Sequence, residues 1–494
     1  MTQQIRVRMA PAPTGRFHIG NARTALYDWL LARHHNGAFI LRIEDTDRAR
    51  SSPDHVAEIL EAFRWLGLDW DEGPEVGGDC GPYFQSERLH LYRQAASRLL
   101  DEGKAYYCYC TPDELDQRRR EMESKSLPPR YNRHCRDLSQ ADRVRLEAEG
   151  RPKAIRFAAP DHGAVAWEDL IRATIEFQCS ELDDFVLAKA DGFPTYLLAC
   201  VVDDAAMAIS HVVRGEDLIS STPRQILIYR ALDLPVPRFA HLPLILGPDR
   251  AKLSKRHGPV AVLDYRDQGF LPDAIVNFIA LLGWSPGDDR ERLSRDELIQ
   301  SFSLDGIGKS AAVFDIEKLS WMNGVYLREL PPDQYLSHAR PFLESALGQL
   351  PAEFDDQYVA RALLLEQERA RTLAELPQLT EFFFGEPERY DEKGERKWFR
   401  REGAADLLAG VRAALDGLAS FEVGAIETAV RGVADQVGAK AGPVIHTTRL
   451  AVTGRTKGPG LFELIAVLGK ERVLKRLAHA QQHIRSLPES SPQP

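Results

Sequence analysis

The sequence predicts an α/β protein whose first part contains a parallel sheet and whose last part is helical. Near the N-terminus, residues 5–9 alternate as in a strand, apolar residues from Ala22 to Leu30 recur at helical spacing, and residues 39–43 predict a second strand. Residues 85–195 are less regular, which predicts a domain inserted between two halves of the sheet domain. Beyond Asp264 helical periodicity dominates. The predicted class is a Rossmann-like α/β domain with an insertion, followed by an all-α region.

The loop between the first strand and the first helix predicts a phosphate site. Residues 9–21 read Met-Ala-Pro-Ala-Pro-Thr-Gly-Arg-Phe-His-Ile-Gly-Asn and lead directly into the helix. A helix N-terminus gathers unpaired N–H groups and a positive dipole end, which suit phosphate. His18, Gly20 and Asn21 lie where the loop meets the helix. Taken alone, His18 is also explained as an ordinary capping or packing residue.

The next predicted helix begins after Ser52-Pro53 and ends at Gly67, with proline first and glycine last. Before it, Glu44 follows the second strand, at the sheet edge where open α/β sheets bind ligands. Glu44 is therefore a candidate partner for a substrate ammonium group. The alternative is a charge pair at the entry to the helix.

The second half of the sheet domain resumes at Tyr196. A strand over residues 208–213 runs into Arg214, a helix starts at residues 221–223, and the strand-like residues 241–246 lead to Lys252-Leu-Ser-Lys-Arg256. Two lysines in a loop after a strand suit a triphosphate whose charge shifts during a reaction. The alternative for this cluster is a solvated surface loop.

Together the two loops resemble the "HIGH" and "KMSKS" motifs of class I aminoacyl-tRNA synthetases, and further motifs resemble the glutamyl-tRNA synthetase family in particular. The resemblance runs from about Ile5 to about Leu477. The further motifs are Arg8-Met-Ala-Pro-Ala-Pro-Thr-Gly15, Arg42-Ile-Glu-Asp-Thr-Asp-Arg48, Gly81-Pro-Tyr-Phe-Gln-Ser-Glu-Arg88, Asp191-Gly-Phe-Pro-Thr-Tyr196, Phe314-Asp-Ile-Glu-Lys-Leu-Ser-Trp-Met-Asn323 and the stretch from Pro459 to Arg472.

The resemblance implies five parts of the chain. These are a Rossmann-like catalytic domain (1–84 and 196–251), an inserted acceptor-end-binding domain (85–195), a stem-contact domain (252–330), a helical anticodon-binding domain (331–385) and a C-terminal helical anticodon-binding domain with a disordered tail (386–494). It implies that the enzyme ligates L-glutamate to glutamate tRNA through a glutamyl-adenylate, using ATP with Mg²⁺.

The resemblance also implies roles for individual residues. The residues assigned to catalysis are His18, Gly20, Asn21, Lys252 and Lys255. Those assigned to ATP binding are His18, Gly20, Lys252, Ser254 and Lys255. Those assigned to glutamate binding are Arg8, Ala10, Ala12, Glu44, Tyr196, Cys200 and Arg214. Arginine's planar fork suits the substrate's side-chain carboxylate. The last position of the first motif is often histidine and is Asn21 here, which still donates a hydrogen bond.

Three cysteines of the insertion form a candidate zinc site. Cys108 and Cys110 are separated by one residue, and 24 residues separate Cys110 from Cys135. Zinc takes four ligands, so three thiolates need one more. Some family members carry a site that ends Cys-x-His, and Asp137 occupies that histidine position here. His134 and Tyr131 are the other candidates for the fourth ligand, and three buried free thiols are the alternative to a metal site.

The net negative charge of the chain limits which of its surfaces can bind RNA. The 494 residues carry a net charge of −10, so a nucleic acid must meet a local basic face. Residues 440–476 provide one, with eight basic and two acidic side chains, although a solvated helical face explains them equally well. Residues 366–373 are predicted to lie on a long helix. Within it, Arg369 matches a family position that reads the anticodon and helps separate glutamate tRNA from glutamine tRNA. The alternative is an exposed helix arginine paired with a nearby glutamate.

No signal peptide or membrane-length apolar stretch is evident, so the expected location is the cytoplasm and no membrane partner is expected. A monomer is the default expectation. The rival readings are a glutaminyl-tRNA synthetase, a small-molecule nucleotidyltransferase of the same superfamily and an inactive RNA-binding module. Helical periodicity after Asp355 and an arginine at position 214 argue against a glutaminyl-tRNA synthetase. His18 and the two loop lysines argue against an inactive RNA-binding module.

Overall fold

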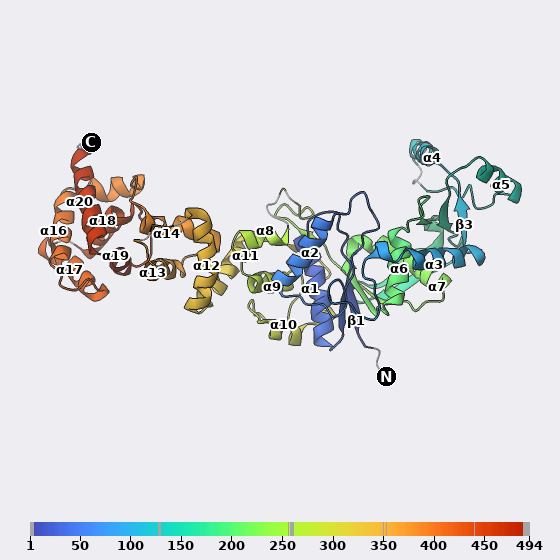
Figure 1. Ribbon diagram of the computed structural model, residues 1–494, viewed down its shortest axis with the longest axis horizontal. Coiled ribbons are helices and arrows are strands. Elements are labelled where there is room, and N and C mark those ends of the chain that lie inside the picture. The colour runs from blue at the N-terminus through green and yellow to red at the C-terminus, as the bar shows by residue number, and fades with distance from the viewer. Residues whose placement is uncertain are drawn as a thin grey trace. The chain divides into compact units, whose positions relative to one another are not determined.

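The computed structural model describes residues 4–126, 130–254, 256, 261–348, 350–351, 353–438 and 440–487. The chain divides into two compact units, one from residues 1–266 and 272–316 and the other from residues 267–271 and 317–494. The first unit mixes helices and strands, and the described part of the second is helical (Figure 1). The finer division into five domains stays a prediction.

A parallel sheet organises the first unit. Strand β1 (Arg6–Met9) pairs in parallel with β2 (Ala38–Leu41), and β8 (His211–Gly215) pairs in parallel with β9 (Arg238–Leu242). The two pairs meet where the Ser210 N–H donates to the carbonyl of Arg6 at 2.9 Å. The helices of this domain are α1 (Ile19–His34), α2 (Pro53–Leu66), α6 (Tyr196–Ala206) and α7 (Thr222–Ala231). Because the strands are parallel, their C-terminal ends and the loops that follow share one edge of the sheet.

Helix α2 confirms the predicted start and stop signals. The Ser52 hydroxyl accepts a hydrogen bond from the Asp54 N–H, and Pro53 is the first helical residue. Gly67 ends the helix with φ 67°, a left-handed conformation that glycine adopts without steric cost. Phe63 and Leu66, both within this helix, are fully buried. These signals are local, which is why the sequence alone reveals them.

The insertion between the two halves of the sheet domain has its own strands. Strands β3 (Ala105–Cys108), β4 (Ala154–Phe157) and β7 (Val186–Ala188) form an antiparallel sheet. Strands β5 (Ala164–Asp169) and β6 (Ala173–Gln178) form a hairpin, and β5 joins the parallel sheet where Asp169 pairs with Phe239 of β9. The helices of this region are α3 (Leu89–Asp101), α4 (Pro112–Ser124) and α5 (Gln140–Ala148). The insertion therefore reaches the central sheet through β5.

The rest of the first unit follows β9. Its elements are β10 (Ile245–Leu246), α8 (Val262–Asp267), α9 (Pro272–Ala280), α10 (Arg295–Ser301) and β11 (Ala312–Val313). Strands β10 and β11 pair in parallel. The single strand predicted over residues 241–246 is divided between the end of β9 and β10. Pro243 and Leu244 separate β9 from β10.

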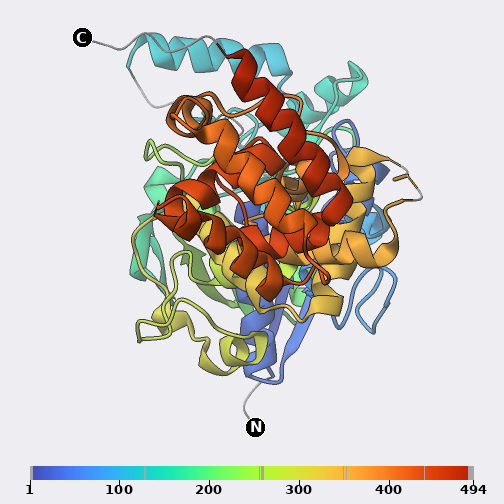
Figure 2. The same ribbon diagram turned by 90° about the vertical axis from the view of Figure 1, so that its left-hand side faces the viewer.

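The described part of the second unit is built from helices. They are α11 (Ile316–Glu329), α12 (Pro332–Leu347), α13 (Asp356–Glu366), α14 (Leu376–Phe384), α15 (Glu392–Gly394), α16 (Ala404–Asp416), α17 (Val423–Gln436), α18 (Ala441–Thr453), α19 (Leu461–Leu468) and α20 (Lys470–Ser486). Helices α16 to α20, orange to red, pack together in both views (Figures 1 and 2). Within the described ranges, no helix combines the length and the apolar character that crossing a bilayer requires.

Candidate active site

A cavity of about 720 Å³ opens at the C-terminal edge of the parallel sheet. The predicted site residues that line it are Arg8, Ala10, Ala12, His18, Gly20, Asn21, Glu44, Tyr196, Arg214, Lys252 and Ser254. Both loops singled out in the sequence therefore face one space, although more than two hundred residues separate them. Lys255 lies outside the residues that the structure describes.

His18 caps the helix that faces this cavity. Its Nδ1 accepts a hydrogen bond from the Asn21 N–H at 3.2 Å, so the proton of a neutral ring lies on Nε2. Desolvation by the surrounding protein and the charge of Lys252 lower the pKa of His18, with Asp217 opposing them. A neutral His18 is thus available at pH 7 as a hydrogen-bond donor. A Cβ at Gly20 would lie 3.1 Å from the His18 ring, so a larger residue there would displace it.

Lys252 extends toward the same cavity from the other loop. Its ammonium lies 3.3 Å from the Asp217 carboxylate, and both side chains are more than half exposed. An exposed ion pair of this kind holds its partners weakly. Lys252 can therefore exchange Asp217 for a more highly charged anion such as a triphosphate.

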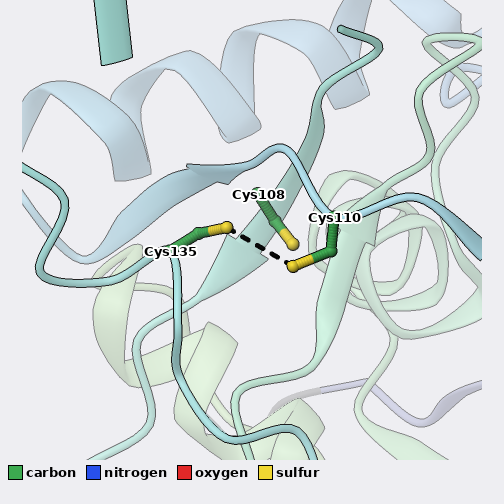
Figure 3. A group of neighbouring side chains, drawn as sticks. All are labelled: Cys108, Cys110 and Cys135. Carbon is green, nitrogen blue, oxygen red and sulfur yellow. Dashed lines mark hydrogen bonds between the residues drawn. The ribbon is translucent and has the colours of Figure 1, made fainter. Parts of the chain in front are cut away.

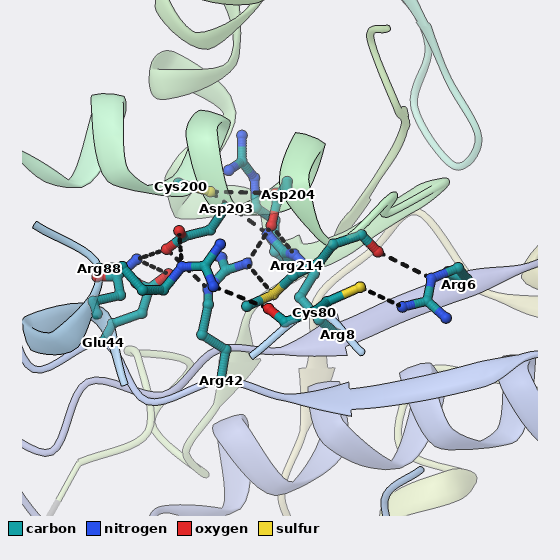
Figure 4. A network of polar contacts seen from close by, with 12 residues as sticks. Arg6, Arg8, Arg42, Glu44, Cys80, Arg88, Cys200, Asp203, Asp204 and Arg214 are labelled. Atoms are coloured by element: carbon teal, nitrogen blue, oxygen red, sulfur yellow. Dashed lines mark hydrogen bonds and ion pairs between the residues drawn. The ribbon is translucent and has the colours of Figure 1, made fainter. Parts of the chain in front are cut away.

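Arg8 belongs to a buried network of charges (Figure 4). Its Nε and Nη2 lie 3.1 and 3.2 Å from the two carboxylate oxygens of Asp204, and Arg42 donates to the same carboxylate at 2.7 Å. Burial alone would raise the pKa of Asp204, but the charges of Arg8 and Arg42 lower it to about 2. Arg42 also pairs with Glu44 at 3.1 Å. The charge of Arg8 is thus already balanced by a carboxylate of the protein.

Arg214 differs from Arg8 in having only neutral partners. It is 4% exposed and lines the cavity. Its three nitrogens donate to the Tyr196 hydroxyl at 3.0 Å, the Thr222 hydroxyl at 2.7 Å and Nε2 of His241 at 3.2 Å. Among the described residues, no carboxylate forms an ion pair with it. A buried, uncompensated guanidinium at the wall of a cavity is suited to bind the carboxylate of a ligand.

The other predicted glutamate-binding residues lie at different depths. Ala10 and Ala12 line the cavity through the loop after β1, and Glu44 lines it beside Arg42. Burial raises the pKa of Glu44, against the lowering effect of Arg42. Cys200 is 2% exposed and does not line the cavity. Its thiol instead lies 3.8 Å from Arg8 and 3.4 Å from Asp204, behind the wall.

The three predicted metal-binding cysteines come together in the insertion (Figure 3). The Sγ atoms of Cys108, Cys110 and Cys135 lie within 4.8 Å of one another. Asp137, the predicted fourth ligand, is exposed in the turn through residues 134–137 and lies outside this group, and its role as a ligand stays a prediction. The Tyr131 hydroxyl is the oxygen that lies near the thiols, 3.4 Å from Cys108 and 3.8 Å from Cys110.

Arg369 belongs to the second unit and is not among the residues that line the cavity. The long helix predicted around it is wrong, since α13 ends at Glu366 and Arg369 follows in a turn. Its guanidinium pairs with the fully buried carboxylate of Glu366 and is one-third exposed. Burial raises the pKa of Glu366 to about 7, and Arg369 opposes that rise.

The basic segment 440–476 is partly neutralised by acidic residues from other elements. The pairs are Arg455 with Glu381, Arg472 with Glu353, and both Lys475 and Arg476 with Glu386. The surplus of positive charge counted along the sequence therefore overstates the charge of the folded surface.

Several residues around the cavity are not among those predicted from the sequence. Asp204 lies eight residues after Tyr196, with Cys200 between them, and this i, i+4, i+8 spacing was a signal for one face of a helix. His241 and Thr222, which hold Arg214, lie inside an apolar strand and at a helix start. Nothing in their local sequence separates them from core residues.

A Rossmann-like sheet whose His-Ile-Gly loop and Lys-Leu-Ser loop face one cavity defines a class I aminoacyl-tRNA synthetase, and comparison with known proteins agrees. Residues 4–321 match the family model described as tRNA synthetases class I (E and Q), catalytic domain, and residues 334–481 match an anticodon binding domain. The chain belongs to the glutamate–tRNA ligase family.

Similar proteins cover nearly the whole chain. A glutamate–tRNA ligase from Moorella thermoacetica is 52% identical over 98% of this chain and 99% of its own length. One from Desulforudis audaxviator is 49% identical, with 96% of both chains covered. A solved glutamate tRNA ligase from Elizabethkingia meningosepticum, in complex with its amino acid, superposes with a TM-score of 0.90 at 36% identity, covering 98% of this chain and 100% of that one.

Proposed function

We propose that this chain ligates L-glutamate to the 3′ end of glutamate tRNA, in two steps that pass through a glutamyl-adenylate. The observation that supports it best is Arg214, a buried guanidinium with neutral partners at the wall of the cavity. A γ-carboxylate would supply the missing counter-charge. Glutamine, which carries an uncharged amide, would leave the guanidinium uncompensated. A glutaminyl-tRNA synthetase is also not favoured because the described C-terminal region is helical.

In the first step the α-carboxylate of glutamate attacks the α-phosphorus of ATP, and pyrophosphate leaves. The protein acts by placement and by charge stabilisation. The Nε2–H of neutral His18 and the N–H groups at the start of α1 hold the phosphates, and Gly20 keeps space for the His18 ring. Lys252, with Lys255, offsets the charge that develops on pyrophosphate. Mg²⁺ accompanies ATP rather than occupying a protein cage.

The residues around the amino acid take complementary roles. Arg214 and the Tyr196 hydroxyl hold the side-chain carboxylate, while Glu44 faces the α-ammonium group. Arg8 acts mainly by fixing the network around Asp204, because that carboxylate already balances its charge. Arg369 contacts the anticodon in the second unit. We place the enzyme in the cytoplasm, as a monomer.

The insertion would hold one structural zinc ion. Three thiols within 4.8 Å supply the sulfur donors that structural zinc prefers, and the oxygen of a nearby phenol is available as a fourth donor. We therefore assign Tyr131, rather than Asp137, as the fourth ligand. Metal analysis of the purified protein should give one zinc per chain, retained by Asp137→Asn and weakened by Tyr131→Phe. Zinc loss in Asp137→Asn alone would reverse this assignment.

Charging of purified glutamate and glutamine tRNAs with radiolabelled glutamate, ATP and Mg²⁺ tests the proposed function. Glutamate on its own tRNA only is the expected product of a discriminating enzyme. Glutamate on both tRNAs would support the proposed ligation reaction and contradict the role of Arg369 in discriminating between the two tRNAs. No charging of either tRNA by the folded protein would refute the proposal.

A further inference from the structure

Two buried titratable groups behind Arg214 take no part in the proposed reaction. His241 is on β9, and Asp169 ends β5 of the insertion; both side chains are fully buried. The carboxylate of Asp169 lies 2.5 Å from Nδ1 of His241. On its other side, His241 contacts Arg214 through Nε2 at 3.2 Å. The three side chains thus form a line from the insertion to the wall of the cavity.

The hydrogen bonds of Asp169 fix the orientation of this line. Its Oδ1 accepts from the backbone N–H groups of Ile171, Arg172 and His241 at 3.0 to 3.2 Å. Its Oδ2 is left to accept from the imidazole. Because a carboxylate held by three N–H groups is an acceptor, Nδ1 of His241 must carry the proton. The Nε2 atom then presents a lone pair toward Arg214.

The lone pair on Nε2 is what Arg214 requires. The Arg214 Nε–H donates to it, and the Thr222 hydroxyl lies 3.0 Å from the same atom while accepting from Arg214 Nη2. Burial and the positive charges of Arg214 and Arg172 lower the pKa of His241, outweighing Asp169. The ring is therefore neutral at pH 7, and it orients the guanidinium without cancelling its charge.

We propose that Asp169 and His241 are positioning residues for recognition of the substrate's side-chain carboxylate, acting through Arg214. A carboxylate in direct contact with Arg214 would neutralise it, as Asp204 neutralises Arg8. The imidazole keeps the carboxylate of Asp169 one ring away. Arg214 stays rigid and cationic, and the cavity can favour glutamate over glutamine. This inference rests on the proposed function and extends it to two further residues.

The test is ATP–pyrophosphate exchange in the presence of glutamate tRNA, with KM measured separately for glutamate and for ATP. His241→Leu removes the acceptor and should raise the KM for glutamate by about tenfold or more, with the KM for ATP unchanged. His241→Gln supplies an amide oxygen and should restore most of the loss. Asp169→Asn keeps the size but frees the tautomer, so that an Nε2–H would oppose the Arg214 Nε–H. It should raise the KM for glutamate as well.

A matched control is His211→Gln, which alters the first residue of the strand that carries Arg214. It should leave both KM values unchanged. Melting temperatures identify any variant that is merely unfolded, and Asp169→Asn serves if His241→Leu does not fold. An unchanged KM for glutamate in Asp169→Asn and in folded His241→Leu would overturn the inference, as would a parallel rise of both KM values. Absence of glutamate-dependent exchange in the unmodified enzyme would instead refute the proposed function.

Discussion

Asp28 of α1 should make the first unit less stable as the pH rises. Its side chain is fully buried, and neither carboxylate oxygen has a hydrogen-bond partner among the described residues. Burial raises its pKa well above the ordinary value, with Arg8 opposing and Asp204 reinforcing that rise. The folded protein therefore holds Asp28 protonated at a pH where the unfolded chain releases the proton.

The direction and ceiling of the effect follow from proton linkage. Above about pH 4 the unfolded state ionises at residue 28 and the folded state does not, so the free energy of unfolding falls by about 1.4 kcal/mol per pH unit. This loss continues until the pH reaches the folded-state pKa. If that pKa lies above 7, the loss at pH 7 is about 4 kcal/mol, which is the cost of protonating an ordinary aspartate there.

Asp28→Asn removes the proton equilibrium and nearly keeps the shape. We expect the variant to match the parent protein at pH 4 and to exceed its stability increasingly between pH 5 and 7. The assay is urea unfolding followed by tryptophan fluorescence at each pH, in which the transition midpoints of the two proteins are compared. Asp79→Asn, at an exposed aspartate, is the control and should show no such trend. A stability difference that is constant or shrinks with rising pH would refute the reasoning.

Three further substitutions test the proposed site. Arg214→Met should raise the activation free energy for reaction with glutamate by about 2–5 kcal/mol, because the substrate carboxylate loses its partner. This corresponds to a loss of roughly 30- to 5,000-fold in kcat/KM for glutamate. An equal loss in kcat/KM for ATP would contradict this. Lys252→Ala should lower kcat in the exchange assay by about 10²–10³ without changing the melting temperature, since the side chain is 66% exposed, and an unaltered kcat would exclude its role. Arg369→Gln should raise the KM for tRNA in aminoacylation; a lower melting temperature with unchanged tRNA KM would show that Arg369 only compensates Glu366.

Elements whose boundaries are marked by residues close to them in the sequence could be predicted from the sequence alone. The serine cap, first-turn proline and final glycine of α2 are adjacent to the helix that they delimit. The loop before α1 predicts a phosphate site because glycine, histidine and a helix start occur together in the sequence. The predicted α/β class with a helical C-terminal region is confirmed for the same reason: periodicity is readable within each segment.

Contacts between distant segments could not be predicted in the same way. The environment of Arg214 combines β5, β8, β9 and two helices, so its neutral partners are visible only in the fold. Sequence spacing likewise does not show that a turn leaves the Asp137 side chain exposed and outside the cysteine group. Around Arg369, the apolar pattern of the sequence stays helical beyond Glu366, although the helix ends there and the chain turns. The sequence alone therefore predicts too long a helix.

The contribution of β5 to the central sheet limits how far this enzyme can be reduced in size. A compact catalytic fragment in which a short linker replaces residues 85–195 would lose Asp169 together with the strand that carries it. His241 could then adopt either tautomer, and Arg214 would lose its fixed orientation. A shortened enzyme should therefore retain the β5–β6 hairpin, even where the remainder of the insertion is dispensable. The part of the chain that supports the amino-acid cavity therefore extends into the insertion and does not stop at its ends.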